Sequence, residues 1–411
     1  MIEPAEISTA PAVLRRSLHL PPPERRAVIV GVGESEFRKW GGITDRSQLQ
    51  VACEAIIAAA HDAGVPVREL DGFASYSDDE NEAILLHTAL GCRQLRHASM
   101  VWGGGGGGNC GAIAHAAAAV IAGQARHVVA FRGLCQGQAF RFGQYHPWTS
   151  HTNFTAPFGM LAPVHMLAMV ARRHMTEFGT RPEHFYEVAR VCRDNALRNP
   201  RAVMRRGPLT KDEYFSSRMI SDPLRLFDCC LESDGACAVV ITTLDRARDL
   251  PGHAVEIIAV GAGGGPQWSS GALGAHNMPL ARYTTGNSVE LASELYAAAD
   301  LKPADIDCAQ LYDAFTSTVL VALEDFGFCA RGESGPFLAA GLGDWPNGQL
   351  PINTAGGHLS EAYMHGFNLV TEGVRQIRGT STSQVAAAQH CLICGAPGVA
   401  PTSAVIVGRV R

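Results

Sequence analysis

Short apolar runs rich in β-branched residues alternate with helical patterns along the chain, and this alternation limits the possible folds more than any other feature of the sequence. Residues 27–32 read Ala-Val-Ile-Val-Gly-Val, and a helical pattern follows over 47–63. The pattern then predicts a strand at 72–76, a helix at 111–123 and a strand at 127–131. Such alternation is typical of βαβ units built around a largely parallel sheet.

The second half of the chain repeats the plan of the first. Residues 254–260 read Ala-Val-Glu-Ile-Ile-Ala-Val and correspond to the opening strand. In each half an aspartate precedes a tyrosine by five residues, Asp71 before Tyr76 and Asp307 before Tyr312. Two α/β halves of similar design are therefore expected.

The repeat divides the chain into parts. Residues 1–25 are rich in proline and arginine and are expected to form an extended N-terminal tail. We expect the N-terminal half at 26–250 and the C-terminal half at 251–411. Within the first half, residues of about 132–225 are more polar and carry helical patterns, so we expect them to form a loop-domain excursion that covers the active site.

Composition excludes several classes of protein. The 411 residues carry a formal net charge of −5 with both signs interspersed, which gives no support for nucleic-acid binding. The most apolar stretch, 112–122, is too short to span a bilayer, and the N-terminus lacks the pattern of a signal peptide. The 12 cysteines do not follow the pattern of a secreted disulfide framework. A cytoplasmic enzyme that does not bind a membrane is expected.

A net negative chain needs a local basic patch to hold an anionic ligand. Arg201, Arg205 and Arg206 lie close together in the sequence and are the candidate for such a patch.

Six consecutive glycines, Gly103 to Gly108, precede the helix expected at 111–123. Glycines permit positive φ and close approach of a ligand to the backbone, and the N–H groups at the start of a helix favour negative charge. This pattern favours a site for an anionic group; a resemblance described below implies that the anion is a thioester enolate. Two alternatives are a flexible surface loop and a dinucleotide-binding turn, but the spacing does not match Gly-x-Gly-x-x-Gly with a suitably placed acidic residue.

Four segments, taken in order, resemble the thiolase superfamily and within it the lipid-transfer-protein (SCP2-thiolase-like) branch. They are the glycine run, Ser233-Asp-Gly-Ala236, Tyr312-Asp-Ala-Phe315 and Asn353-Thr-Ala-Gly356-Gly357-His-Leu-Ser-Glu-Ala-Tyr363-Met-His365-Gly366. The resemblance extends from about residue 27 to the C-terminus. It implies the thiolase fold, an α/β fold in which two duplicated βαβ-type halves form a five-layered αβαβα core.

The residues that perform covalent chemistry in condensing thiolases are replaced here. The sixth residue after the Gly-Gly pair is a catalytic histidine in those enzymes and is Tyr363 in this chain. Tyr312 replaces the asparagine of the Asn-Glu-Ala-Phe box, and the position of the nucleophilic cysteine, counted back from Gly123, falls on Gly106. Without that nucleophile no acyl-enzyme can form at this position. An oxyanion hole could still stabilise the enolate of an acyl-CoA.

Tyrosines at both substituted positions are the pattern of the aldolases of bacterial steroid side-chain degradation, and the sequence is most similar to that group. The resemblance implies retro-aldol cleavage of a 17-hydroxy steroid C22-oyl-CoA to a 17-ketosteroid and propionyl-CoA. It also implies a homodimer within a heteromeric complex, with a DUF35-type OB-fold partner that is itself associated with a MaoC-like hydratase. No cofactor is expected, because coenzyme A is part of the substrate.

The resemblance places acid and base catalysis on Tyr312 and Tyr363, without assigning which is the acid and which the base. A phenol holds its proton at neutral pH and is suited to donate it to a carbanion, whereas a phenol that acts as a base needs a lowered pKa. The alternative is a purely structural role, in which both are half-buried core tyrosines whose hydroxyls have hydrogen-bond partners. Gly106 and Gly357 are candidates for the oxyanion hole, and His365 for a hydrogen bond to a phenol or for packing beside it.

Cysteines offer the main alternative chemistry. Cys110 lies about one helical turn past the expected nucleophile, and Cys391 and Cys394 form a C-x-x-C pair near the place of the thiolase acid/base cysteine. We expect all three cysteines to be buried structural residues, and we expect a structural role for His358 as well. We expect no zinc site, because no further ligands lie nearby in the sequence. Two rival functions follow: a 3-ketoacyl-CoA thiolase-like acyltransferase that uses a cysteine, and a non-catalytic lipid- or acyl-CoA-binding subunit.

Overall fold

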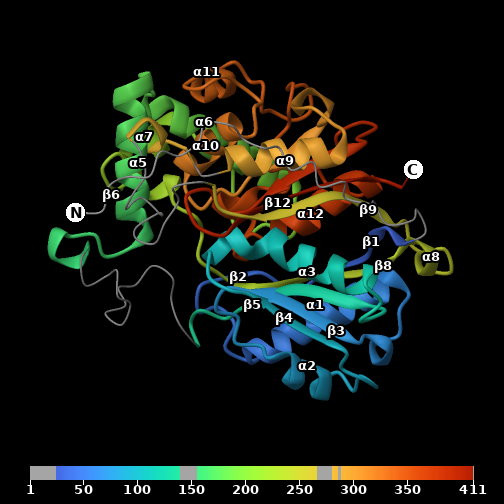
Figure 1. Cartoon of the computed structure of the whole chain (residues 1–411). Coiled ribbons are helices and arrows are strands. Elements are labelled where there is room, and N and C mark those ends of the chain that lie inside the picture. Colours follow the sequence, from blue (N-terminus) through green and yellow to red (C-terminus); the bar gives the residue numbers. More distant parts are fainter. Residues whose placement is uncertain (1–24, 139–154, 266–279, 286–287, 411) are drawn as a thin grey trace, which may run out of the picture.

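The computed structural model describes residues 25–138, 155–265, 280–285 and 288–410 (Figure 1). Of the N-terminal tail expected at 1–25, all but Arg25 lies outside these residues, as does the 139–154 part of the excursion. Figure 1 shows the first half of the chain (blue to teal) on one side of the molecule and the second half (orange to red) on the other.

The first half folds around a five-stranded stretch of sheet with the order β4–β3–β5–β8–β1. Its strands are β1 (Ala27–Glu34), β3 (Gly72–Tyr76), β4 (His97–Val101), β5 (Val128–Leu134) and β8 (Ser233–Thr243). The strand β3 runs parallel to β4 and β5, whereas β8 is antiparallel to both β5 and β1. A short strand, β2 (Arg38–Lys39), also pairs with β8.

The second half repeats this arrangement in the order β10–β11–β12–β9. Its strands are β9 (Val255–Gly263), β10 (Cys308–Gln310), β11 (His390–Cys394) and β12 (Thr402–Arg409). The strands β10 and β11 are parallel, and β12 is antiparallel to β11 and to β9. A short pairing of β1 with β9 joins the two halves of the sheet.

Two aspartates make the same hydrogen bonds in the two halves. The Asp71 carboxylate accepts from the backbone N–H groups of Arg126 and His127, just before β5. The Asp307 carboxylate accepts from those of Gln389 and His390, at the start of β11. The duplication predicted from the spacing of Asp71 and Asp307 to their tyrosines is therefore present in the hydrogen bonds as well.

Helices complete five layers. The helix α1 (Gln48–Ala63) covers the outer face of the first half of the sheet, and α9 (Val289–Ala299) packs on β9 and β12 of the second. The helices α3 (Asn109–Ile121) and α12 (Phe367–Arg378) each contact strands of both halves and form the middle layer. The predicted αβαβα fold class is confirmed.

The middle layer explains the alanine-rich sequence of α3. This helix is enclosed by strands on both sides, so large side chains would push the two halves of the sheet apart. Its buried residues are small or compact, among them Ala112, Ala116 and Ala119.

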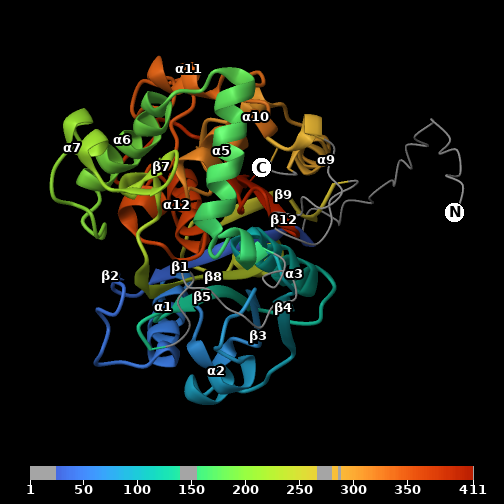
Figure 2. The same ribbon diagram turned by 90° about the vertical axis from the view of Figure 1, so that its left-hand side faces the viewer.

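The excursion forms a helical lobe on one side of the core, seen in green in Figures 1 and 2. It contains α5 (Pro163–Phe178), α6 (Pro182–Arg198), α7 (Lys211–Ser216) and the hairpin of β6 (Met219–Ser221) and β7 (Leu224–Arg225). The helix α6 packs on α10 (Thr316–Asp325), on α11 (Ser334–Ala339) and on a π-helical turn, η9 (Gly357–Glu361). Two short helices, α2 (Ala83–Ala89) and α8 (Leu244–Ala247), lie in the first half. None of the described helices is both long enough and apolar enough to cross a bilayer.

Candidate active site

The hydroxyls of Tyr312 and Tyr363 lie 3.1 Å apart and share a hydrogen bond. Tyr312 follows β10, and Tyr363 follows the turn η9. Both side chains are buried, and burial raises the pKa of each phenol well above that of a free tyrosine. The two phenols therefore both hold their protons at neutral pH.

The glycine run lies against this pair. A Cβ atom added at Gly106 would stand 1.9 Å from the Tyr312 hydroxyl oxygen, so the phenol fills the space of a side chain at position 106. Gly103, Gly104 and Gly105 have positive φ, and Gly106 to Gly108 are buried just before α3. The hydroxyl of Tyr312 thus occupies the space of a side chain at position 106, which the resemblance predicts to be the position of the nucleophile.

Gly357 lies in the turn that carries Tyr363. Its φ is +58°, and a Cβ there would approach an Asp313 carboxylate oxygen to 2.2 Å. That carboxylate accepts hydrogen bonds from the backbone N–H groups of His358 and Leu359. The glycine therefore permits Asp313 to hold the turn, which is a structural role beside the oxyanion-hole role predicted for it.

Two histidines adjoin the tyrosines. The buried ring of His358 packs edge-on against Tyr312, with 4.5 Å between ring centroids, and against Tyr363 at 5.2 Å. His365 has a φ of +51°, and its ring lies 5.7 Å from that of Tyr363. Burial lowers the pKa of both histidines, that of His365 strongly. Both rings are therefore neutral near pH 7.

Tyr76 and Arg132 also lie beside the tyrosine pair, although neither was predicted to be a site residue. Tyr76 ends β3 and donates from its hydroxyl to the carbonyl oxygen of His365, at 2.8 Å. Arg132 lies on β5 with its side chain 1% exposed, and its guanidinium carbon is 5.2 Å from the Tyr76 ring centroid. Two signals were available: Tyr76 is the repeat counterpart of Tyr312, and Arg132 follows the apolar residues Val-Val-Ala-Phe.

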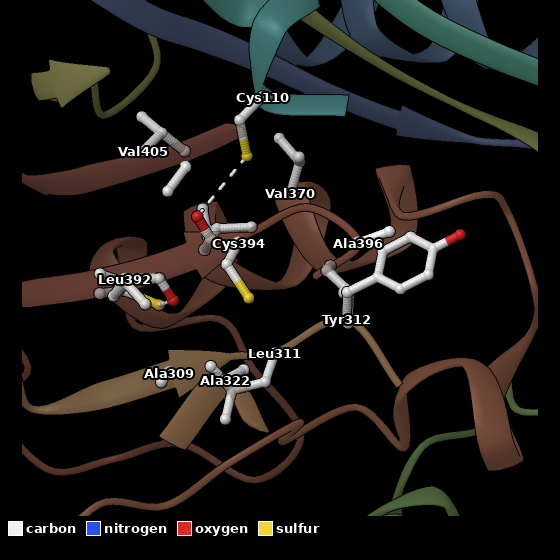
Figure 3. Close-up of a cluster of buried hydrophobic side chains, with 14 of the residues drawn as sticks. Cys110, Ala309, Leu311, Tyr312, Ala322, Val370, Leu392, Cys394, Ala396 and Val405 are labelled. Carbon is white, nitrogen blue, oxygen red and sulfur yellow. Dashed lines mark hydrogen bonds between the residues drawn. The ribbon is translucent and has the colours of Figure 1, made fainter. Parts of the chain in front are cut away.

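The cysteines lie in the core, as expected. The Cys110 thiol is fully buried and is directed at the carbonyl oxygen of Ile393, 3.5 Å away (Figure 3). Burial raises the pKa of Cys110, and it raises that of Cys394 to about 12. Cys391 is also buried, in β11 beside Cys308. Figure 3 shows the hydroxyl of Tyr312 pointing away from the sulfurs of Cys110 and Cys394.

The predicted basic patch does not form as a unit. The Arg201 Nε lies 3.0 Å from a carboxylate oxygen of Glu34, which also pairs with Arg375. Only Arg205 and Arg206 of the three are exposed, because the charge of Arg201 is used by the buried Glu34. Within the described part of the chain no group of three or more His, Cys, Asp or Glu residues is arranged to hold a metal ion.

A hollow of about 530 Å³ lies beside α5, away from the tyrosines. Its lining includes His165, Arg172, Arg173 and Tyr283, and it does not include Tyr312 or Tyr363.

Comparisons with known proteins agree with the fold. Residues 276–409 match the family described as thiolase C-terminal domain-like. The chain is 39% identical to a 17-hydroxy-3-oxo-4-pregnene-20-carboxyl-CoA lyase of Mycobacterium tuberculosis, over 93% of this chain and 99% of that protein. It is also 39% identical to a steroid side-chain-cleaving aldolase of Thermomonospora curvata, over 94% of this chain and 98% of that protein.

A solved structure extends this similarity to three dimensions. The Ltp2-ChsH2(DUF35) aldolase superimposes with a TM-score of 0.87 at 38% identity, over 94% of this chain and 98% of the matched chain.

The contact between Gly106 and Tyr312 can be tested by stability. We expect Gly106→Ala to lower the free energy of unfolding by about 1–3 kcal/mol, because the methyl group overlaps the phenol. In a Tyr312→Asn background, which vacates that space, the same change should cost less than half as much. Chemical denaturation of the four proteins measures the coupling.

Gly263→Ala is the matched control, since a Cβ there meets no atom of the described residues within 4 Å. An equal cost of Gly106→Ala in both backgrounds would show that Tyr312 does not occupy the space beside Gly106.

Proposed function

Because this chain belongs to the thiolase-superfamily aldolases that cleave steroid side chains, we propose that it cleaves the Cα–Cβ bond of a β-hydroxyacyl-CoA. The observation that carries the proposal is the Tyr312–Tyr363 hydrogen bond at 3.1 Å, beside a glycine at the position of the nucleophile. The proposed substrate is a 17-hydroxy steroid C22-oyl-CoA, and the products are a 17-ketosteroid and propionyl-CoA.

The reaction balances with proton transfers alone. A base removes the proton of the β-hydroxyl, the C–O bond becomes a carbonyl, and the electron pair of the Cα–Cβ bond moves into the thioester as an enolate. An acid then protonates Cα and releases the acyl-CoA. No oxidant or reductant is consumed, so the proposed chemistry needs no cofactor beyond the coenzyme A of the substrate.

The two phenols suit these two steps. The hydrogen bond between Tyr312 and Tyr363 allows the phenol that keeps its proton to donate to the phenol that has lost one. The buried N–H groups at the start of α3 supply the dipoles that an enolate oxygen requires. We propose Gly106 for that contact, together with the turn at Gly357.

The acyltransferase alternative finds no support in the cysteines. A nucleophile needs an accessible thiolate. Cys110, Cys391 and Cys394 are all buried, and burial raises the pKa of Cys110 and of Cys394. An acyl-enzyme on any of these three residues would therefore need a rearrangement of the core.

A DUF35 protein is the proposed partner, in line with the Ltp2-ChsH2(DUF35) aldolase that this chain resembles. The substrate carries a β-hydroxyl, which is what hydration of an enoyl-CoA produces. We therefore propose that a MaoC-like hydratase associates with the same partner and supplies the substrate. We also propose a cytoplasmic setting, because all 12 cysteines are free thiols.

A homodimer is proposed through the edge strand β4. This strand ends the order of the sheet, and its outward residues include Met100, with Trp102 just beyond it at 93% exposed. An edge that carries exposed apolar side chains is a template for pairing with a second copy.

The cleavage itself is the first test. The protein, alone and with its DUF35 partner, is incubated with a 17-hydroxy steroid C22-oyl-CoA, and the products are identified by mass spectrometry. Tyr363→Phe and Tyr312→Phe should each reduce kcat/KM by at least about 100-fold, because each removes a proton-transfer group. Cys110→Ala should retain activity.

Loss of activity in Cys110→Ala together with thiolysis of a 3-ketoacyl-CoA would overturn the proposal in favour of the acyltransferase. Binding of the substrate without cleavage, even with the partner present, would point to a non-catalytic subunit.

The oligomer is tested by analytical ultracentrifugation. A mass of about twice the 43.7 kDa of one chain is expected, and Met100→Glu should shift it toward one chain. Met169→Glu, at an exposed methionine of α5, is the matched control. A wild-type mass of one chain would contradict the dimer, and an unchanged Met100→Glu dimer would move its interface away from β4.

A further inference from the structure

We propose that Arg132 is a positioning residue of this site, whose guanidinium group, held behind Tyr76, supplies the positive charge that stabilises the phenolate and enolate anions of the reaction. The inference rests on the proposed function and goes beyond it, because it names the residue that makes a buried tyrosine pair able to lose a proton.

The guanidinium group is fixed by several bonds. It donates to the carbonyl oxygen of Tyr76 at 2.6 Å and to a carboxylate oxygen of Asp78 at 2.8 Å, and it lies 3.7 Å from Asp79. It also lies over the Tyr76 ring, where a cation is attracted to the π face. A charge held this tightly in the interior is screened little by water.

Tyr76 connects this charge to the rest of the site. Its hydroxyl holds the backbone of His365, its ring lies 5.7 Å from the His365 ring, and its Cβ packs on Gly108. His365 in turn adjoins Tyr363. Tyr76 therefore lies between Arg132 and His365, the residue that adjoins Tyr363.

The charged and titratable groups around the tyrosine pair come from several elements. They include Tyr76 at the end of β3, Asp78 and Asp79 after it, Arg132 on β5, Cys230 and Glu232 before β8, Asp313 after Tyr312, and His358 and His365 on either side of Tyr363. Within this group of described residues Arg132 carries the positive charge, since both histidines are neutral.

The positive charge of Arg132 lowers the pKa of the neighbouring phenols and of His365. Burial raises the phenol pKa values, whereas Arg132 lowers those of Tyr76, Tyr312 and Tyr363. Burial is the largest cause of the low pKa of His365, and the charge of Arg132 is the second largest. The same charge therefore favours a phenolate and keeps the adjacent imidazole neutral.

Asp78 provides a test of opposite sign. Its side chain is half exposed, whereas that of Asp79 is fully buried and accepts from Ser75, Asn81 and Gly133. Neutralising Asp78 removes a negative charge next to Arg132 at little cost to folding. Asp78→Asn should thus lower the phenol pKa, whereas Arg132→Gln should raise it.

The experiment measures a phenol directly. The 3,5-difluorotyrosine analogue, which titrates at lower pH than tyrosine, is placed at position 363 and followed by ¹⁹F NMR against pH. Arg132→Gln should raise its pKa by about one unit and Asp78→Asn should lower it by about half a unit. Arg132→Lys, which keeps the charge, should shift it less than Arg132→Gln. Thermal denaturation checks that each variant is folded.

The pH dependence of kcat/KM for cleavage gives the second readout. This profile is measured on protein without the fluorinated tyrosine. The ascending limb of kcat/KM should move to higher pH in Arg132→Gln and to lower pH in Asp78→Asn. A purely structural Arg132 would lower activity at every pH and leave both the limb and the ¹⁹F titration unmoved, which would overturn the inference. Shifted titrations in a protein that cleaves no substrate would instead leave the charge effect intact and refute the proposed function.

Discussion

The close packing of the Tyr312 phenol on the glycine run is the contact on which the rest of the site depends. Only hydrogen at position 106 leaves room for the hydroxyl, which then meets that of Tyr363. A side chain at position 106 and a tyrosine at 312, in its present orientation, therefore exclude each other sterically. The glycine at position 106 leaves the space of a side chain free, and the phenol of Tyr312 fills it.

Duplication of the fold brings these parts together. Tyr76 ends β3 and Tyr312 follows the corresponding strand β10, and the two reach the glycine run from the two halves of the chain. The small side chains of α3 let both halves of the sheet approach the same helix, so its N-terminal turn lies between them. The lobe that contains α6 then packs on the turn η9 and holds Tyr363 in place.

The plan of the fold and the positions of the two tyrosines could be predicted from the sequence, because they depend on local patterns. The alternation of strands and helices, the repeat of Asp71 and Asp307, and the two substituted tyrosines are all visible in one dimension. The close approach of Gly106 to Tyr312 is not, because it joins residues 206 positions apart. Arg132 was missed because its role depends on what its guanidinium faces, and Arg201 was misjudged because its partner, Glu34, is remote in sequence.

We propose that carbon–carbon bond cleavage proceeds here without an acyl-enzyme. Intact-protein mass spectrometry of samples quenched in acid during turnover would detect such an intermediate. We expect the polypeptide to keep its unmodified mass at every time while propionyl-CoA accumulates. A transient species heavier by one acyl group, removed by hydroxylamine and mapped to a cysteine, would contradict it.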